Sequence, residues 1–211
     1  MIVVSIVLDV VVVGLFAADA ITKHFRSRSQ HQKQYTNMSS DSEQQEHLKY
    51  LKICLDEARK SPPKSTNFCV GALILHNPPS SEPRILTTGY TLETPGNTHA
   101  EQSCFVKLAE ASGLSEEKVD EVLPNEDVVL YTTMEPCWKR SVGNMPCVQR
   151  ILRAKKIKKV VCGVEEPETF IGENEGRKIL RDAGIEVVYV SGLEEDILKV
   201  ATAGHVKDKK P

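Results

Sequence analysis

The sequence predicts an α/β fold, a three-layer α/β/α sandwich around a mixed five-stranded sheet. Helix and strand patterns alternate over most of the chain after residue 40, which is typical of helices packed on both faces of one sheet. An apolar share of 40% is sufficient for a hydrophobic core. A helix pattern separates the last two predicted strands, so we expect those strands to be parallel.

Local signals predict where each element begins and ends. Ser40 followed by Glu43 is a capping-box pattern that starts the first helix, and Pro62 ends it. Gly113 and Gly184 mark the ends of two further helices. The predicted strands are 70–75, 85–92, 128–133, 159–164 and 187–190, and the predicted helices begin near residues 40, 98, 147, 173 and 193.

The first 37 residues differ from the rest of the chain. Residues 1–21 are rich in Val and Ile, and a polar stretch follows them. Asp9 and Asp19 interrupt the apolar run, so its uncharged stretches are shorter than the ~18 residues of a membrane-spanning helix. The alternatives are a weak signal anchor, an organelle presequence and an extension outside the fold. We favour the extension for residues 1–37, place the globular domain at 38–211, and expect no stable membrane association.

Charge and cysteine content narrow the class of protein. A net charge of −2 and an aromatic share of 5% disfavour a dedicated nucleic-acid binder, which carries a basic face and stacking rings. Four of the six cysteines lie in apolar periodic segments, as reduced cysteines do. We therefore expect a reducing, intracellular compartment. Cys137 and Cys147 each follow a proline in predicted loops and need a separate explanation.

Three short segments carry the chemistry. Thr98-His99-Ala100-Glu101 opens a predicted helix, Cys137 follows a buried strand, and Cys147 opens the next helix. One imidazole and two thiolates supply three ligands to a catalytic zinc, whose fourth position stays open for water. Glu101, two residues beyond His99, is placed to face that water as a general acid and base without binding the metal. We therefore expect Zn²⁺ as the cofactor.

These segments resemble the zinc-binding motifs of the cytidine-deaminase superfamily. The chain departs from the common pattern because nine residues, 138–146, separate the cysteines where two are usual. A similarly long loop occurs in the deaminases of riboflavin biosynthesis. The stretch from Met134 to Leu152, together with 170–174 and 201–205, is similar to the fungal members. The resemblance extends over roughly residues 43–205 and implies that residues 38–211 form a zinc-dependent deaminase domain with the cytidine-deaminase fold.

The resemblance also implies a substrate and its contacts. The substrate is a diamino-(ribitylamino)pyrimidinone 5′-phosphate, and the hydrolytic reaction releases its ring amino group as ammonia. Asn67 corresponds to an asparagine that contacts the sugar or its equivalent in the superfamily. Lys139, Arg140 and Asn144, in the long loop, are the other candidate substrate contacts. For Lys139 and Arg140 the chemistry of the residues leaves two alternatives, contact with the phosphate or a solvated place in the loop. We expect a cytoplasmic homo-oligomer with no nucleic-acid partner.

Two other functions remain as alternatives. The first is a zinc deaminase of another pyrimidine nucleotide, such as a deoxycytidylate, which the long loop disfavours. The second is a catalytically inactive partner subunit with the deaminase fold. Such proteins typically lose the carboxylate that moves the proton, so the presence of Glu101 disfavours this alternative.

Overall fold

The computed structural model describes residues 41–140, 143–167 and 175–205. The chain divides into two units, Met1–Asn37 and Met38–Pro211. The predicted N-terminal extension and the Ser40 end of the capping box lie outside the described residues, so both stay predictions. Among the helices of the described ranges, none is long and apolar enough to cross a membrane.

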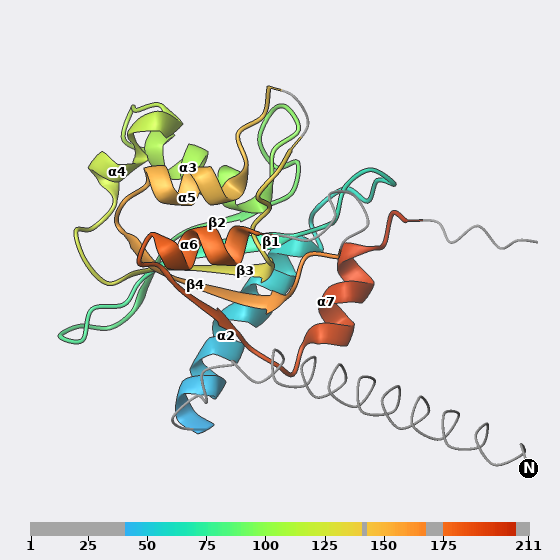
Figure 1. The fold of residues 1–211 in the computed structure, drawn as a ribbon, viewed down its shortest axis with the longest axis horizontal. Coiled ribbons are helices and arrows are strands. Elements are labelled where there is room, and N and C mark those ends of the chain that lie inside the picture. Colours follow the sequence, from blue (N-terminus) through green and yellow to red (C-terminus); the bar gives the residue numbers. More distant parts are fainter. Residues whose placement is uncertain (1–40, 141–142, 168–174, 206–211) are drawn as a thin grey trace, which may run out of the picture. The chain divides into compact units, whose positions relative to one another are not determined.

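A mixed five-stranded sheet forms the middle layer, in the order β2-β1-β3-β4-β5 (Figure 1). β1 runs antiparallel to β2 on one side and to β3 on the other. The pairs β3–β4 and β4–β5 are parallel, which confirms the predicted direction of the last two strands. The strands are β1 (Gly71–His76), β2 (Arg84–Tyr90), β3 (Val128–Met134), β4 (Ile157–Val164) and β5 (Glu186–Tyr189).

Helices cover both faces of this sheet, which confirms the predicted three-layer sandwich. One face carries α3, α4, α5 and α6, and the opposite face carries α2 and α7 (Figure 1). The helices are α2 (Asp41–Ala58), α3 (Ala100–Glu110), the 3₁₀ turn η1 (Glu116–Lys118), α4 (Val119–Val122), α5 (Cys147–Arg153), α6 (Gly176–Asp182) and α7 (Glu194–Ala201).

Side chains of the central strand β3 alternate between two hydrophobic cores. Leu130 packs into the core beneath α3 and α5, whereas its neighbour Tyr131 packs into the core beneath α2 and α7. Successive side chains of a strand point to opposite faces, so a strand buried on both faces has few polar positions. Leu130 and Tyr131 are at most 1% exposed, and β3 lies between β1 and β4, so β3 is at the centre of this domain.

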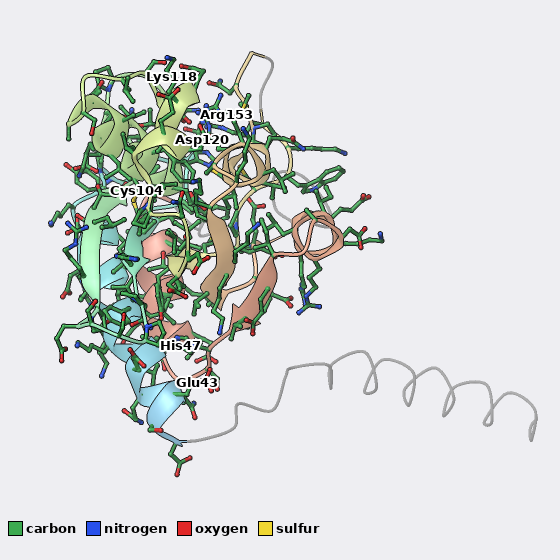
Figure 2. All side chains as sticks on the ribbon, turned by 90° about the vertical axis from the view of Figure 1, so that its left-hand side faces the viewer. Glu43, His47, Cys104, Lys118, Asp120 and Arg153 are labelled. Atoms are coloured by element: carbon green, nitrogen blue, oxygen red, sulfur yellow. The ribbon has the colours of Figure 1, made fainter. Side chains whose placement is uncertain are left out.

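α2 lies unusually close to the sheet at Gly71. A Cβ atom at this position would lie 1.9 Å from the Cys54 carbonyl oxygen of α2, so only glycine permits this approach. At the other end of α2, His47 forms a 2.8 Å hydrogen bond with the Tyr131 hydroxyl of β3. Figure 2 shows His47 and Glu43 at that end of the helix. These two contacts fix α2, and with it the loop that leads from α2 into β1.

The elements between α3 and β3 were not predicted. Residues 116–122 form η1 and α4, which pack beside α3. The predicted helix start near residue 173 lies in a stretch outside the described residues, and the described part of that helix begins at Gly176. The other predicted helices and strands are present, with ends that shift by a few residues.

Candidate active site

Three segments of the fold bring His99, Cys137 and Cys147 together. His99 immediately precedes α3, with extended backbone angles of φ −90° and ψ 164°. Cys137 lies three residues beyond the end of β3, and Cys147 is the first residue of α5. The Val148 N–H donates to the Cys137 carbonyl oxygen at 3.1 Å, which joins the start of α5 to the end of β3.

The three side chains fit the donor geometry of a metal site. Their ligand atoms all lie within 4.8 Å of one another. The His99 Nδ1 atom lies 3.4 Å from the Cys137 Sγ and 3.5 Å from the Cys147 Sγ. Tetrahedral zinc, with Zn–S near 2.3 Å and Zn–N near 2.0–2.1 Å, would separate sulfur and nitrogen by about 3.6 Å. Both the residue types and the spacing therefore suit zinc.

The buried thiols of Cys137 and Cys147 differ in how readily they lose a proton. The Cys147 S–H and the His99 ring stabilise the Cys137 thiolate, so the pKa of Cys137 lies well below its usual range. The pKa of Cys147 is raised well above its usual range, because this thiol donates to Cys137 and is fully buried. A bound metal cation favours deprotonation of both groups, because the thiolate is the ligand form.

Glu101 lies beside the three donors, on the first turn of α3. Its carboxyl group is buried, and its Oε2 lies 3.4 Å from the Cys147 Sγ. Burial, followed by the charge of Cys137, raises the pKa of Glu101. A raised pKa favours the protonated form of the carboxyl group, which is the form that can donate a proton to a substrate.

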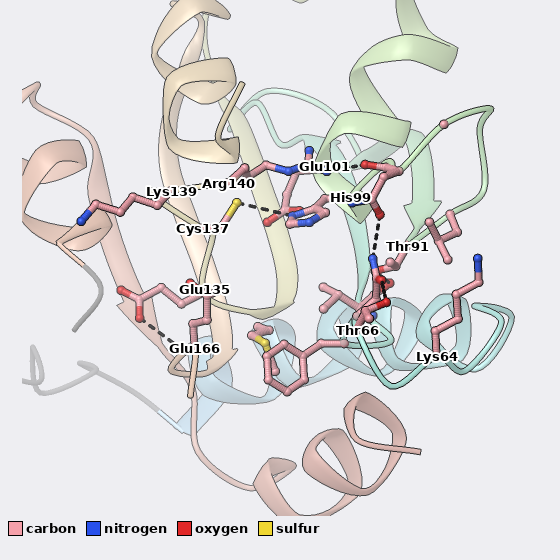
Figure 3. A pocket seen from close by; sticks show the side chains of 17 residues that line it. Lys64, Thr66, Thr91, His99, Glu101, Glu135, Cys137, Lys139, Arg140 and Glu166 are labelled. Atoms are coloured by element: carbon pink, nitrogen blue, oxygen red, sulfur yellow. Dashed lines mark hydrogen bonds between the residues drawn. The ribbon is translucent and has the colours of Figure 1, made fainter. Parts of the chain in front are cut away.

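A cavity of about 700 Å³ opens in front of these groups (Figure 3). His99, Glu101 and Cys137 form part of its wall. This volume is within the usual range for small-molecule sites, about 300–1,000 Å³. The other lining residues are Lys64, Thr66, Asn67, Phe68, Val70, Thr91, Leu92, Gly96, Asn97, Met134, Glu135, Lys139, Arg140 and Glu166.

Asn67 and Arg140, two of the predicted substrate contacts, line the cavity and also bind other protein groups. The Asn67 Nδ2 donates to the Asn97 Oδ1 at 2.8 Å, and its Oδ1 accepts from Thr66 at 2.7 Å. Arg140 donates to the Gln102 Oε1 at 3.0 Å and to the Asn97 carbonyl oxygen. Asn97 therefore joins the segments that carry both predicted contacts.

The other two predicted contacts differ from each other in their position. Lys139 lines the cavity, but its Nζ lies 3.8 Å from the centre of the Trp138 ring, as a cation–π pair does. Asn144 is exposed and is not among the residues that line the cavity. Trp138 packs against the core beneath α5.

The sequence patterns missed several lining residues. Asn97 lies two residues before His99, and Lys64 lies three residues before Asn67. Their proximity to motif residues was the one signal available. Glu135, directly after β3, also lines the cavity and accepts from the Glu166 N–H at 3.4 Å.

Residues 44–164 match the family described as the cytidine and deoxycytidylate deaminase zinc-binding region. The chain belongs to this deaminase family. The match includes His99, Glu101, Cys137 and Cys147, and it confirms the resemblance identified from the motifs.

Relatives within the deaminase family confirm the resemblance to the fungal enzymes of riboflavin biosynthesis. The diaminohydroxyphosphoribosylamino-pyrimidine deaminase of Schizosaccharomyces pombe is 36% identical over 159 residues, which is 75% of this chain. This chain spans only 36% of the length of that relative.

Solved structures of the Aspergillus oryzae Rib2 deaminase, as a C-terminal deletion mutant, also match. One is 50% identical with a TM-score of 0.71, covering 75% of this chain and 92% of the other. Another, in complex with DARIPP, is 48% identical with a TM-score of 0.69 and covers 75% of this chain and 91% of the other. These matches confirm the cytidine-deaminase type of fold.

Proposed function

We propose that this chain catalyses the hydrolytic, zinc-dependent removal of a ring amino group from a diamino-(ribitylamino)pyrimidinone 5′-phosphate in riboflavin biosynthesis. The observation that carries the proposal is the group of His99, Cys137 and Cys147 beside buried Glu101, at the wall of a 700 Å³ cavity. The similarity of this chain to the diaminohydroxyphosphoribosylamino-pyrimidine deaminase of Schizosaccharomyces pombe supports the choice of substrate class.

His99, Cys137 and Cys147 would hold the zinc ion. When bound, zinc acts as a Lewis acid and lowers the pKa of its bound water to about 7. Because His99 and the two cysteines come from three separate segments, the fold itself defines the site. The cavity lies on the side of the site from which a substrate would approach.

Glu101 would move the protons of the reaction. It accepts a proton from the attacking water, whose oxygen forms a bond to the ring carbon. It then gives a proton to the departing amino group, which leaves as ammonia when the C–N bond breaks. The raised pKa of this buried carboxyl group favours acceptance of the proton from water, and its place beside the Cys147 thiol supports its role in both steps.

Cavity residues on two sides would bind the rest of the substrate. We propose that Asn67 contacts the ribityl hydroxyls and that Arg140 and Lys139 contact the phosphate. Arg140 has five N–H donors. Two of its nitrogen atoms donate to protein acceptors, so further N–H groups remain for a ligand. Asn144 would contribute only if the bound substrate reaches beyond the cavity. Lys64 adds a cation to the wall that carries Asn67.

Release of ammonia from a set of substrates tests this function. We expect faster turnover of the ribitylamino compound than of its ribosylamino form, and poor turnover of cytidine and deoxycytidylate. A flexible ribityl chain can bend its phosphate towards the loop that carries Lys139 and Arg140, whereas a closed furanose holds it elsewhere. Preferential turnover of deoxycytidylate would contradict the riboflavin assignment, and no turnover of any substrate would favour an inactive partner subunit.

Substrate without phosphate tests the phosphate contact. One charge-assisted contact is worth about 1.5–3 kcal/mol, so Arg140→Ala should raise KM roughly ten- to a hundredfold for the phosphorylated substrate. The same variant should leave KM for the dephosphorylated substrate nearly unchanged. An equal rise for both substrates would show that Arg140 acts on the loop and not on phosphate.

Cytoplasmic location, homo-oligomer formation and the lack of a nucleic-acid partner stay predictions.

A further inference from the structure

The C-terminal end of the long loop between the two cysteines has to place Cys147 beside Cys137 and His99. Gly143, Asn144 and Met145 are exposed, whereas Cys147, two residues later, is fully buried. Pro146 precedes α5, and no side chain caps that end of the helix. With two residues between the cysteines, the short connection itself would limit where the second cysteine can lie. A connection of nine residues has many more conformations, so other contacts must fix the position of Cys147.

Arg150 lies one turn into α5 and reaches back to the end of this loop. Its side chain is buried, and its Nε donates to the Met145 carbonyl oxygen at 3.2 Å. The Arg150 backbone N–H donates to the Pro146 carbonyl oxygen, also at 3.2 Å. One residue therefore binds both carbonyl groups that precede Cys147.

The guanidinium of Arg150 is itself anchored by Glu116. Its Nη1 donates to both carboxylate oxygens of Glu116, and the two side chains are 8% and 11% exposed. Glu116 begins η1, which packs on α3, the helix that follows His99. Arg153, on the same face of α5, also donates to Glu116, at 2.9 Å, and pairs with Glu117, but within the described ranges none of these bonds reaches the loop. Figure 2 shows Arg153 and the η1–α4 residues Lys118 and Asp120 at one end of the domain formed by the described residues.

We infer that Arg150 and Glu116 are positioning residues that hold Cys147 in place for the metal. Glu116 fixes the guanidinium, the guanidinium fixes the Met145 carbonyl group, and the loop then enters α5 with Cys147 beside Cys137 and His99. The inference rests on the proposed metal site. It gives a role to η1, the segment that was not predicted, and it explains how the chain places its second thiol despite the long loop.

Zinc release into a chromogenic chelator tests the inference without use of activity. Arg150→Met should release zinc at least about tenfold faster, since residues that orient metal ligands typically contribute 10–100-fold to affinity. Arg150→Lys keeps the buried positive charge for Glu116 but lacks the fork that reaches Met145, so it should also release zinc faster. Arg153→Met is the matched control, because it removes a partner of the same carboxylate, and its release rate should stay within about twofold of wild type.

A second measurement follows the Cys147 thiol in metal-free protein. Alkylation by iodoacetamide, followed by peptide mass spectrometry at one pH, should be faster at Cys147 in both Arg150 variants than in wild type and Arg153→Met. Wild-type rates of zinc release and alkylation in the Arg150 variants would overturn the inference, as would equal acceleration by Arg153→Met. If Cys147→Ala keeps its zinc, the proposed metal site fails, and the alkylation experiment still tests the positioning role.

Discussion

Substitution of Glu101 can separate proton transfer from metal binding, because Glu101 lies beside the metal donors. Its carboxyl group contacts the Cys147 thiol but is not one of the three grouped donors. Glu101→Gln keeps the size and a hydrogen-bonding group but cannot accept a proton. We expect zinc content and thermal stability near wild type and a kcat lower by at least about 10²–10⁴-fold, the contribution of general acid–base catalysis.

Steady-state ammonia release and zinc analysis of the same preparation measure this separation. A variant that keeps more than about a tenth of wild-type activity would exclude Glu101 as the proton-transfer group. A loss of zinc together with activity would place Glu101 in the metal site.

Cys147 is the ligand whose assignment depends most on the fold, because its spacing from Cys137 is unusual. Cys147→Ala removes one of three donors and should remove most of the zinc, which is about one ion per chain in wild type for a single catalytic site. Cys69→Ala is the control, since Cys69 is also buried and free but lies in the loop before β1. Full zinc in purified Cys147→Ala would contradict the assignment.

Residue types and their order predicted the grouped donors, but not what surrounds them. His99, Glu101, Cys137 and Cys147 carry a recognisable chemical pattern at fixed positions along the chain. Asn97 and Arg150 do not, because their partners are distant in sequence or are backbone carbonyl groups. Arg140 was predicted only as a phosphate contact, and its bonds to Gln102 and Asn97 needed the fold.

At the scale of elements, the hydrogen bond between His47 and Tyr131 joins α2 to the central strand β3. Burial lowers the pKa of His47, and the charge of Lys159 acts in the same direction, against Glu43, Glu46 and Glu186. The folded protein therefore favours neutral His47, and the unfolded chain binds the proton more tightly. Stability from this group is complete above the unfolded pKa of about 6.5 and is lost as pH falls from there towards the lowered folded pKa.

Chemical denaturation between pH 5 and pH 8 tests this linkage. Wild type should lose unfolding free energy below about pH 6.5, with a slope from one proton of at most about 1.4 kcal/mol per pH unit. His47→Gln lacks the titrating group, so the difference between the two proteins should vanish or reverse towards low pH. A constant difference across the whole range would show that His47 is not the group responsible.

Strong periodic patterns predicted the long elements, whereas η1 and α4 gave no comparable signal. The strands β3 and β4 each contain a run of apolar residues, 128–131 and 160–164, as strands buried on both faces do. η1 and α4 contain three and four residues, too few to repeat a helical period. Their position depends on the contacts of Glu116 and Asp120 with α5 and the residues beyond it, contacts that local sequence does not encode.

In the domain as a whole, the candidate site lies at the carboxyl ends of the parallel strands. Cys137 follows β3 and Glu166 follows β4, and both line the cavity. Open α/β sheets commonly bind ligands at this edge, because the loops there converge while the strands fix their bases. The site therefore needs the sheet and the helices of both faces, all of which lie within residues 41–201.

Removal of residues 1–37 tests this division of the chain. The two hydrophobic cores contain residues between Leu48 and Ala201, and α2, the first described helix, begins at Asp41. A protein that starts at Met38 keeps all of these groups, so we expect it to fold, to hold about one zinc ion and to release ammonia at the full-length rate. Its melting temperature should lie within about 2 °C of the full-length value, as for changes that touch no core contact. Circular dichroism, zinc analysis and the ammonia assay measure the three properties. An insoluble or inactive truncated protein would show that residues 1–37 belong to the fold.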